Sequence, residues 1–190
     1  MNTFISGGCK NGKSYYAQNK AAEIARETGR PLYYIATMIP RDREDLARIA
    51  RHISEREGWG FDTVEQPVRI RELLSREDLD LGGAFLLDSV TAILENEMFP
   101  RRLKGSAGEE ITCDMTAPER VRTELTAFAK AVDAAGGSVV FVSDGIYGDM
   151  GEYSDSTEEY RKALAETDLA LGAICHRVVE ISYGTEEIWK

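Results

Sequence analysis

The chain lacks any long hydrophobic run and has few cysteines. No apolar stretch approaches the roughly 20 residues that a membrane-spanning helix needs, and the N-terminus enters a strand-like pattern directly, so we expect neither a membrane span nor a signal peptide. The cysteines Cys9, Cys113 and Cys175 are odd in number and far apart, which argues against a disulfide framework or a cysteine metal cluster. A reducing cytoplasm is the simplest compartment for such a chain.

Basic residues are also in short supply. The chain has 23 Lys and Arg against 33 Asp and Glu, a formal net charge of -10. A surface that binds nucleic acid or an anionic membrane is expected to be basic, so this balance argues against both partners. It leaves nucleotide binding open, because a local loop and a metal ion can hold phosphates within an acidic protein. Without repeats or low-complexity segments, residues 1–190 are predicted to form one domain.

Residues 7–14 read Gly-Gly-Cys-Lys-Asn-Gly-Lys-Ser and match the phosphate-binding pattern G-x-x-x-x-G-K-S/T. A β-prone run precedes them and a helical stretch follows, an order that a chance glycine-rich turn would not require. The glycines let the backbone N–H groups point at an anion, Lys13 adds a charge for the β- and γ-phosphates, and Ser14 can bind Mg²⁺. The sequence therefore predicts that GTP or ATP binds at Gly7, Gly8, Cys9, Lys10, Asn11, Gly12, Lys13 and Ser14.

Strand-like and helix-like segments alternate along the chain. The pattern predicts helices over residues 13–27, 41–57, 68–75, 90–99, 118–135 and 157–177, the last capped by Ser156 or Thr157. It predicts strands over residues 2–8, 31–37, 84–88 and 138–143, an edge strand over 61–65 and a strand over 178–183 that closes the sheet, with a loop over 104–116. The sequence therefore predicts an α/β fold of the P-loop NTPase type, a mostly parallel sheet with helices on both faces.

The third apolar run ends in Leu86-Leu87-Asp88. In phosphate-loop enzymes an acidic residue at this place holds Mg²⁺, directly or through water. The alternative role for Asp88 is to cap the helix that follows, and the two roles are compatible. We expect Ser14 and Asp88 to hold Mg²⁺.

A second group of polar side chains lies between residues 34 and 67. His52 is four residues from both Arg48 and Arg56, so all three are expected on one helix face. Two flanking guanidiniums would favour a neutral imidazole, whose nitrogen can act as a nucleophile, and they could also clamp phosphate oxygens. The alternative is a solvated charged face with an exposed histidine, which the residues taken alone favour.

These blocks together resemble the bifunctional adenosylcobinamide kinase / adenosylcobinamide-phosphate guanylyltransferase family of cobalamin biosynthesis. The resemblance covers roughly the first half of the chain. It rests on the loop of residues 7–14, on Tyr34-Ile-Ala-Thr37 followed by Arg48-Ile-x-x-His52-x-x-x-Arg56, Trp59 and Thr63-x-Glu65, and on Leu86-Leu87-Asp88 with Thr91.

The resemblance implies an enzyme that phosphorylates the hydroxyl of a cobinamide side chain and transfers GMP from GTP. His52 would carry the GMP covalently, and Lys13 and His52 would be the catalytic residues. The resemblance further implies nucleotide contacts from Thr37, Arg48, Arg56 and Glu65, a corrinoid substrate, and a homotrimer.

The second half of the chain departs from the family pattern. Asp144-Gly145-Ile146-Tyr147 stands where the family has Asn-Glu, a small residue and glycine. Where the family has Phe-Arg-Asp and later Asn-Gln, this chain has Tyr160-Arg161-Lys162 and Glu166-Thr167-Asp168, so that only Arg161 matches well. Two further interpretations stay open: a P-loop small-molecule kinase in which His52 only contacts nucleotide, and a diverged nucleotide-binding protein without transfer activity.

Overall fold

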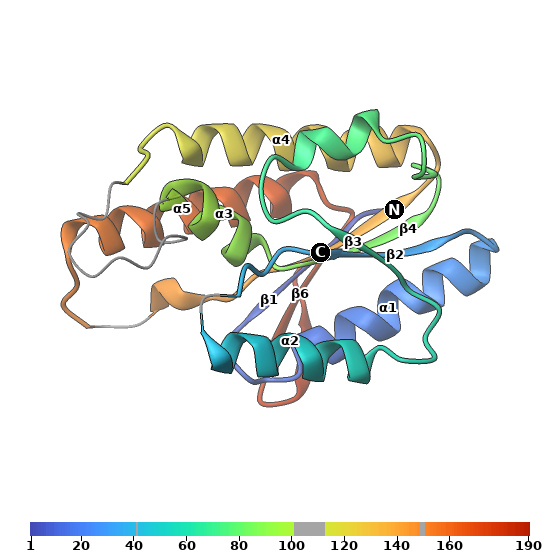
Figure 1. Ribbon diagram of the computed structural model, residues 1–190, viewed down its shortest axis with the longest axis horizontal. Helices are drawn as coiled ribbons and strands as arrows, with labels where there is room; N and C mark the ends of the chain where they lie inside the picture. Colours follow the sequence, from blue (N-terminus) through green and yellow to red (C-terminus); the bar gives the residue numbers. More distant parts are fainter. Residues whose placement is uncertain (41, 101–112, 149–150) are drawn as a thin grey trace.

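The computed structural model describes residues 1–40, 42–100, 113–148 and 151–190, and within α2 it leaves the side chains of residues 48 and 55 undescribed. The described residues form a seven-stranded sheet in the order β3-β2-β4-β5-β1-β6-β7 (Figure 1). Every neighbouring pair is parallel except β6 and β7. The strands are β1 Thr3–Gly7, β2 Leu32–Ala36, β3 Asp62–Glu65, β4 Ala84–Asp88, β5 Ser138–Val142, β6 Arg177–Ser182 and β7 Thr185–Ile188.

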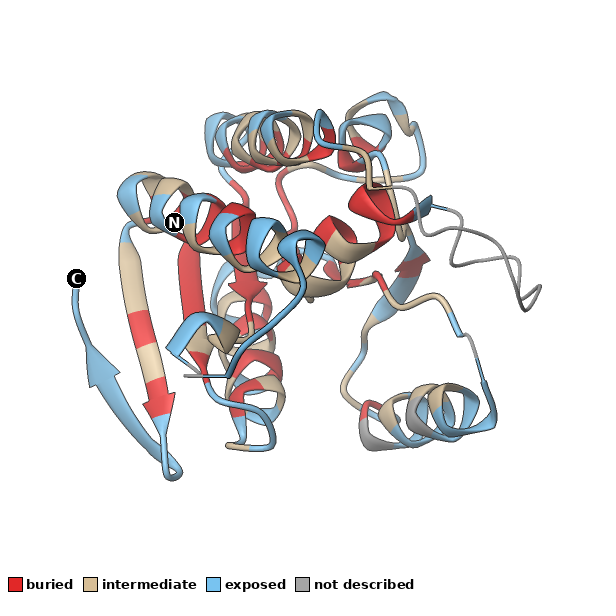
Figure 2. Ribbon diagram, turned by 90° about the vertical axis from the view of Figure 1, so that its left-hand side faces the viewer, coloured by how far each residue is buried: buried red, intermediate tan, exposed pale blue. Residues whose placement is uncertain are grey.

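Helices cover both faces of this sheet (Figures 1 and 2). Helices α1 and α2 lie on one side, and α3, α4 and α5 lie on the other. The α-helices are α1 Lys13–Thr28, α2 Arg43–Glu55, α3 Val90–Met98, α4 Ala117–Ala134 and α5 Asp155–Ile174, and two short 3-10 helices are η1 Ile70–Ser75 and η3 Ile146–Gly148. This arrangement confirms the predicted fold class. None of the described helices is long and apolar enough to cross a membrane.

The sheet is apolar on both faces, as expected for parallel strands between two layers of helices. On one face, three alanines of α1 at positions 17, 21 and 25 pack against Ile5, Leu86 and Val140. Their small side chains recur every fourth residue and therefore share one side of the helix. On the other face, Phe85 packs edge-on against Phe128 of α4, with ring centroids 5.4 Å apart. Both cores include side chains of β1 and β4, and the carboxyl ends of these two strands lie at the same edge of the sheet as the phosphate loop.

Most predicted helices and strands are present, with shifted ends. Gly29 ends α1 with a φ of 64° and donates its N–H to Ala25, which confirms the predicted stop. Asp42 caps α2 by accepting from the Asp45 N–H at 2.9 Å, so this helix starts later than predicted. Of the predicted helix 68–75, only Ile70–Ser75 is helical, as the 3-10 helix η1. Most of the predicted loop 104–116 and the predicted helix start at residue 41 lie outside the described residues.

Two predictions near the C-terminus were wrong. Ser154, not Ser156 or Thr157, caps α5 by accepting from the Thr157 N–H, and the helix ends at Ile174 because the backbone of Cys175 turns to an extended conformation before β6. The predicted last strand does not close the sheet. Positive φ angles at Tyr183 and Gly184 make a tight turn, and the exposed strand β7 then pairs antiparallel with β6. Its sequence, Thr-Glu-Glu-Ile, has too few apolar residues to signal a strand.

Candidate functional site

The phosphate loop joins β1 to α1 and is anchored to the end of β6. Gly7 is buried with a φ of 143°, and a Cβ at this position would collide with the backbone oxygen of Ile181. The side-chain amide of Asn11 donates to that same oxygen, and its Oδ1 accepts from the Lys13 N–H at 3.2 Å. Gly12 starts α1 with a φ of 93°. The glycine positions and Asn11 thus hold the predicted loop conformation, with a helix N-terminus directed into it.

Lys13 lies with its ammonium group inside the loop. The side chain is 5% exposed, and Nζ donates to the Gly8 carbonyl at 2.6 Å. Nζ also forms an ion pair with Asp144 Oδ1 at 2.8 Å. The Gly145 N–H donates to the Gly7 carbonyl at 3.0 Å, which ties the turn after β5 to the loop. Asp144 is a site residue that the sequence prediction missed, although an acid directly after an apolar strand was the available signal.

Asp88, at the end of β4, interacts with residues from several elements of the site. Burial raises the pKa of its carboxyl group, and a hydrogen bond with the Ser14 side chain lowers it. The positive charges of His52 and Lys13 also lower this pKa, whereas the negative charge of Asp144 raises it. Oδ2 is buried and has no hydrogen-bond partner among the described residues. The phosphate loop, α2 and the turn after β5 therefore all act on one carboxylate.

Thr37 links the carboxyl ends of β2 and β4. It is buried, and its hydroxyl accepts from the Ser89 N–H at 2.6 Å and donates to the Ser89 carbonyl at 3.1 Å. Ser89 in turn caps α3 by accepting from the Ala92 N–H, so the alternative cap role for Asp88 is wrong. The buried amide of Asn96 donates to the Thr37 carbonyl at 2.9 Å. Thr37 and Asn96 thus position the strand end that carries Asp88, and sequence reasoning missed Asn96.

Helix α2 carries the predicted histidine group. His52 is half-buried, and its charge acts on Asp88 across the space between α2 and β4. Arg56 follows the helix end, is 7% exposed, and places its guanidinium 3.5 Å from the centre of the Tyr34 ring. The solvated charged face is therefore wrong for Arg56, whose side chain packs on β2. The Arg48 side chain lies outside what the structure describes.

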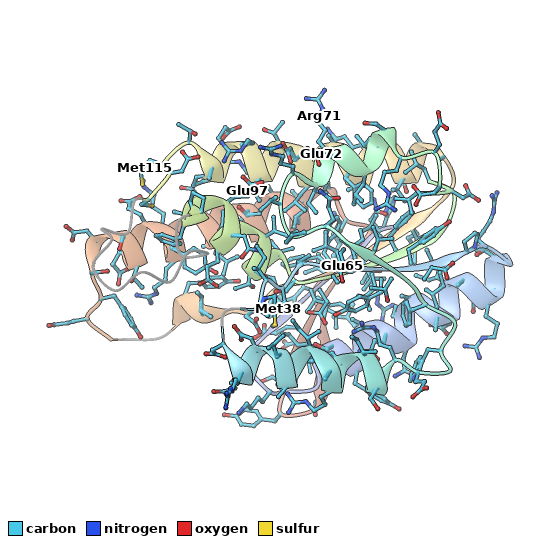
Figure 3. All side chains as sticks on the ribbon, in the orientation of Figure 1. Met38, Glu65, Arg71, Glu72, Glu97 and Met115 are labelled. Carbon is cyan, nitrogen blue, oxygen red and sulfur yellow. The ribbon has the colours of Figure 1, made fainter. Side chains whose placement is uncertain are left out.

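Glu65 is exposed at the end of β3, and Figure 3 labels it together with Met38, just after the end of β2. It follows Val64, whose side chain is buried in the core. The position places Glu65 at the carboxyl edge of the sheet, the edge that also carries Asp88.

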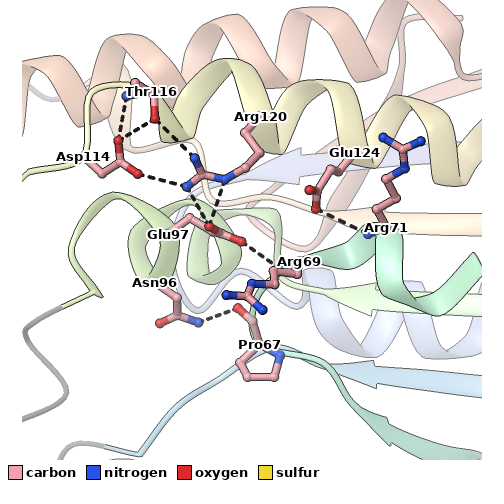
Figure 4. A network of polar contacts seen from close by, with 9 residues as sticks. All are labelled: Pro67, Arg69, Arg71, Asn96, Glu97, Asp114, Thr116, Arg120 and Glu124. Carbon is pink, nitrogen blue, oxygen red and sulfur yellow. Dashed lines mark hydrogen bonds and ion pairs between the residues drawn. The ribbon is translucent and has the colours of Figure 1, made fainter.

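A polar network holds the segment after β3 against α3 and α4 (Figure 4). The buried carboxylate of Glu97 accepts from the backbone N–H of Arg69 at 2.7 Å and from Arg120 Nη2 at 2.9 Å. Arg120 also pairs with Asp114 at 3.0 Å. The Arg69 backbone has a φ of 52°, a conformation that non-glycine residues rarely adopt, so Glu97 stabilises a strained turn.

We expect Glu97→Ala to lower the free energy of unfolding by about 2–3 kcal/mol. The substitution leaves the Arg69 N–H unsatisfied and removes an ion partner of Arg120, losses that carry this order of cost for partly buried groups. Chemical denaturation monitored by circular dichroism would measure the change. The exposed Glu77→Ala is the matched control and should change stability by less than about 0.5 kcal/mol. Equal effects of the two variants would contradict a stabilising role for the network.

The sequence of this chain is similar to sequences of known proteins. A sequence model described as "CobU: Cobinamide kinase / cobinamide phosphate guanyltransferase" matches residues 3–187. The bifunctional adenosylcobalamin biosynthesis protein CobP of Pseudomonas aeruginosa is 33% identical over 124 residues, which cover 64% of this chain and 68% of that protein.

Solved structures share the fold at low sequence identity. The flagellar accessory protein FlaH of Methanocaldococcus jannaschii has a TM-score of 0.53 and 11% identity, covering 100% of this chain and 77% of that one. A KaiC-like protein of Pyrococcus horikoshii has a TM-score of 0.48 and 15% identity, with 98% and 74% coverage. The family model matches nearly the whole chain and so extends the resemblance beyond its first half, and we conclude that the chain belongs to the cobinamide kinase / cobinamide phosphate guanyltransferase family.

Proposed function

We propose that both reactions of the family run at the carboxyl edge of the sheet, with a nucleoside triphosphate bound by residues 7–14 and GMP carried on His52. The observation that carries this proposal is the convergence on Asp88. Ser14 from the loop, His52 from α2 and Asp144 from the turn after β5 all act on its carboxylate. The loop and the imidazole therefore act on the same carboxylate, which supports one shared site for both reactions.

For the kinase reaction, the chain supplies position and charge. The loop N–H groups and the N-terminus of α1 favour the phosphates, and the Lys13 ammonium lies inside the loop. The hydroxyl of the cobinamide side chain would attack the γ-phosphorus, the bond to the nucleoside diphosphate would break, and the hydroxyl proton would leave to solvent. Positioning and charge neutralisation account for most of the acceleration in such transfers.

Mg²⁺ would be held by Ser14 and Asp88. The buried Oδ2 of Asp88 has no hydrogen-bond partner among the described residues, and a carboxylate oxygen beside a hydroxyl is a donor set that Mg²⁺ accepts. When bound, the ion would neutralise charge on the phosphate oxygens.

For the guanylyl transfer, a neutral nitrogen of His52 would attack the α-phosphorus of GTP. An N–P bond forms as the bond to pyrophosphate breaks. A phosphate oxygen of the cobinamide phosphate would then attack the same phosphorus and release the histidine. Thr37, Arg48, Arg56 and Glu65 are proposed as nucleotide contacts around this step. The family resemblance supports a homotrimer, and the few scattered cysteines support a reducing cytoplasm.

We expect Asp88→Asn to weaken the Mg²⁺ dependence of phosphoryl transfer more than it weakens folding. The amide keeps the shape of the side chain but loses the charge that attracts the cation. Titration of Mg²⁺ against activity should show a shift of about tenfold or more in the half-saturating concentration, with a thermal unfolding curve close to that of the wild type. If the mutant titrates as the wild type does, Asp88 plays no part in metal binding.

One observation favours a kinase without guanylyl transfer as the second candidate. The guanidinium of Arg56 packs on the Tyr34 ring, which leaves it less free to clamp a phosphate than the sequence predicts. Labelling with GTP separates the two functions, because only the transferase forms a covalent GMP intermediate.

A further inference from the structure

A buried carboxylate lies behind the phosphate loop and outside the proposed chemistry. Asp168 on α5 is 5% exposed. Its Oδ2 accepts from the Ser143 hydroxyl at 2.9 Å and from the Tyr147 hydroxyl at 3.1 Å, while Oδ1 is buried without a hydrogen-bond partner among the described residues. Two hydroxyl groups thus fix one oxygen of this side chain, which lies in the middle of α5.

The two donors bracket the turn that carries Asp144. Ser143 precedes Asp144 directly, and Tyr147 follows three residues later. The turn is held from other directions as well, because the Asp144 N–H donates to the Thr91 hydroxyl at 2.9 Å and the Gly145 N–H donates to the phosphate loop. Asp168 therefore attaches this turn to α5, and the same turn places Asp144 in its ion pair with Lys13.

We infer that Asp168 is a positioning residue for the phosphate loop: it holds the turn that presents Asp144 to Lys13, and its charge state tunes how tightly the loop binds nucleotide. This inference rests on the proposed binding of nucleotide at residues 7–14. It also joins two segments that depart from the family pattern, since Tyr147 and Asp168 belong to different departures and contact each other directly.

The surroundings of Asp168 set the pH range in which its charge changes. Burial raises the pKa of the carboxyl group, the hydrogen bonds from Ser143 and Tyr147 lower it, and the charge of Asp144 raises it, so that the pKa lies at about 7. Charged groups on the neighbouring elements have their own contacts. The charge of Glu180 on β6 raises the pKa of Tyr147, and Arg161 of α5 donates to the Tyr147 carbonyl. Arg122 of α4 pairs with Glu119 and Glu166, and on α3 the Thr91 hydroxyl accepts from the Asp144 N–H.

The sign of the effect follows from the charges. Below its pKa, Asp168 is neutral, and the loop sees the Lys13 charge opposed by Asp144 alone. Above its pKa, a second negative charge lies behind Asp144 and repels the phosphates of a bound nucleotide. Nucleotide affinity of the wild type should therefore fall, relative to a variant without this ionisation, as the pH rises through about 7.

The test compares GTP binding by the wild type and Asp168→Asn from about pH 6 to about pH 8 by calorimetry. The asparagine keeps an oxygen that can accept from both hydroxyls. Protonation of the nucleotide and of His52 is common to both proteins, so the ratio of their dissociation constants isolates Asp168. We expect equal affinities near pH 6 and a variant that binds about three- to tenfold more tightly near pH 8. Asp133→Asn, on the exposed end of α4, is the matched control and should follow the wild type.

A second variant keeps the test decisive if Asp168→Asn folds poorly. Tyr147→Phe removes a hydrogen bond that lowers the pKa of Asp168, so the pH at which the affinity falls should move upward. A ratio that stays constant within twofold across this range, with GTP binding intact, overturns the inference but leaves the proposed function standing. Failure of the wild type to bind GTP at any pH overturns both.

Discussion

Replacement of Lys13 by alanine is expected to lower phosphoryl transfer by at least about 100-fold and to weaken nucleotide binding. The ammonium group contacts the Gly8 carbonyl and lies inside the loop, where the β- and γ-phosphates are expected. Its loss removes a buried positive charge and leaves the Asp144 carboxylate to repel the phosphates. Kinase turnover and nucleotide affinity, measured on the same preparations, would show both effects.

Two further variants separate this role from a role in folding. Lys13→Met keeps most of the buried side-chain volume and should be as inactive as the alanine variant while unfolding at a temperature closer to that of the wild type. Lys20→Ala, two turns along the same helix, removes an ion pair with Glu23 at the surface and should retain activity. Unchanged turnover in either Lys13 variant would contradict the assignment of residues 7–14 as the phosphate loop of this enzyme.

The second large effect is expected at His52. Incubation with GTP that carries radioactive phosphorus at the α-position should label the protein covalently, and His52→Ala should abolish the label. A phosphoramidate is labile in acid and stable in alkali, which distinguishes it from a phosphoester on serine or threonine. Denaturing electrophoresis after acid and alkali treatment would identify the linkage.

The chain offers a matched control for this experiment. It has two histidines, and the other one, His176, accepts a hydrogen bond from the backbone of Asn2 beside the start of β1. His176→Ala should therefore keep the label. Arg56→Ala should slow labelling without preventing it, because the cation packed on Tyr34 helps to place the end of α2. If the wild type binds GTP and takes no label, the kinase without guanylyl transfer becomes the better description.

Local patterns in the sequence were sufficient to predict several parts of the molecule. The phosphate loop could be predicted because its glycines, Lys13 and Ser14 stand at fixed spacings in one short stretch of the chain, whereas its anchors at Ile181 and Gly145 could not. Apolar runs such as residues 84–88 and 138–143 predicted buried strands because strands covered on both faces need apolar side chains throughout. The apolar run that ends in Asp88 predicted this residue at a strand end, and the expected phosphate-loop fold placed that end near Ser14. The sequence could not predict β7, whose exposed side chains contribute little to the core.

The tertiary structure decided which distant residues meet. Strand β5 is the fifth in the chain yet lies between β4 and β1, so the residues that follow it bring Asp144 against Lys13 and Ser143 against Asp168. No sequence spacing encodes such contacts, because they depend on the strand order and on the helix packed behind each strand. In the same way, the sequence by itself determined that His52 and Arg56 lie four residues apart, but only packing against β2 decided that the guanidinium covers Tyr34, since burying its flat face on an aromatic ring depends on where α2 ends.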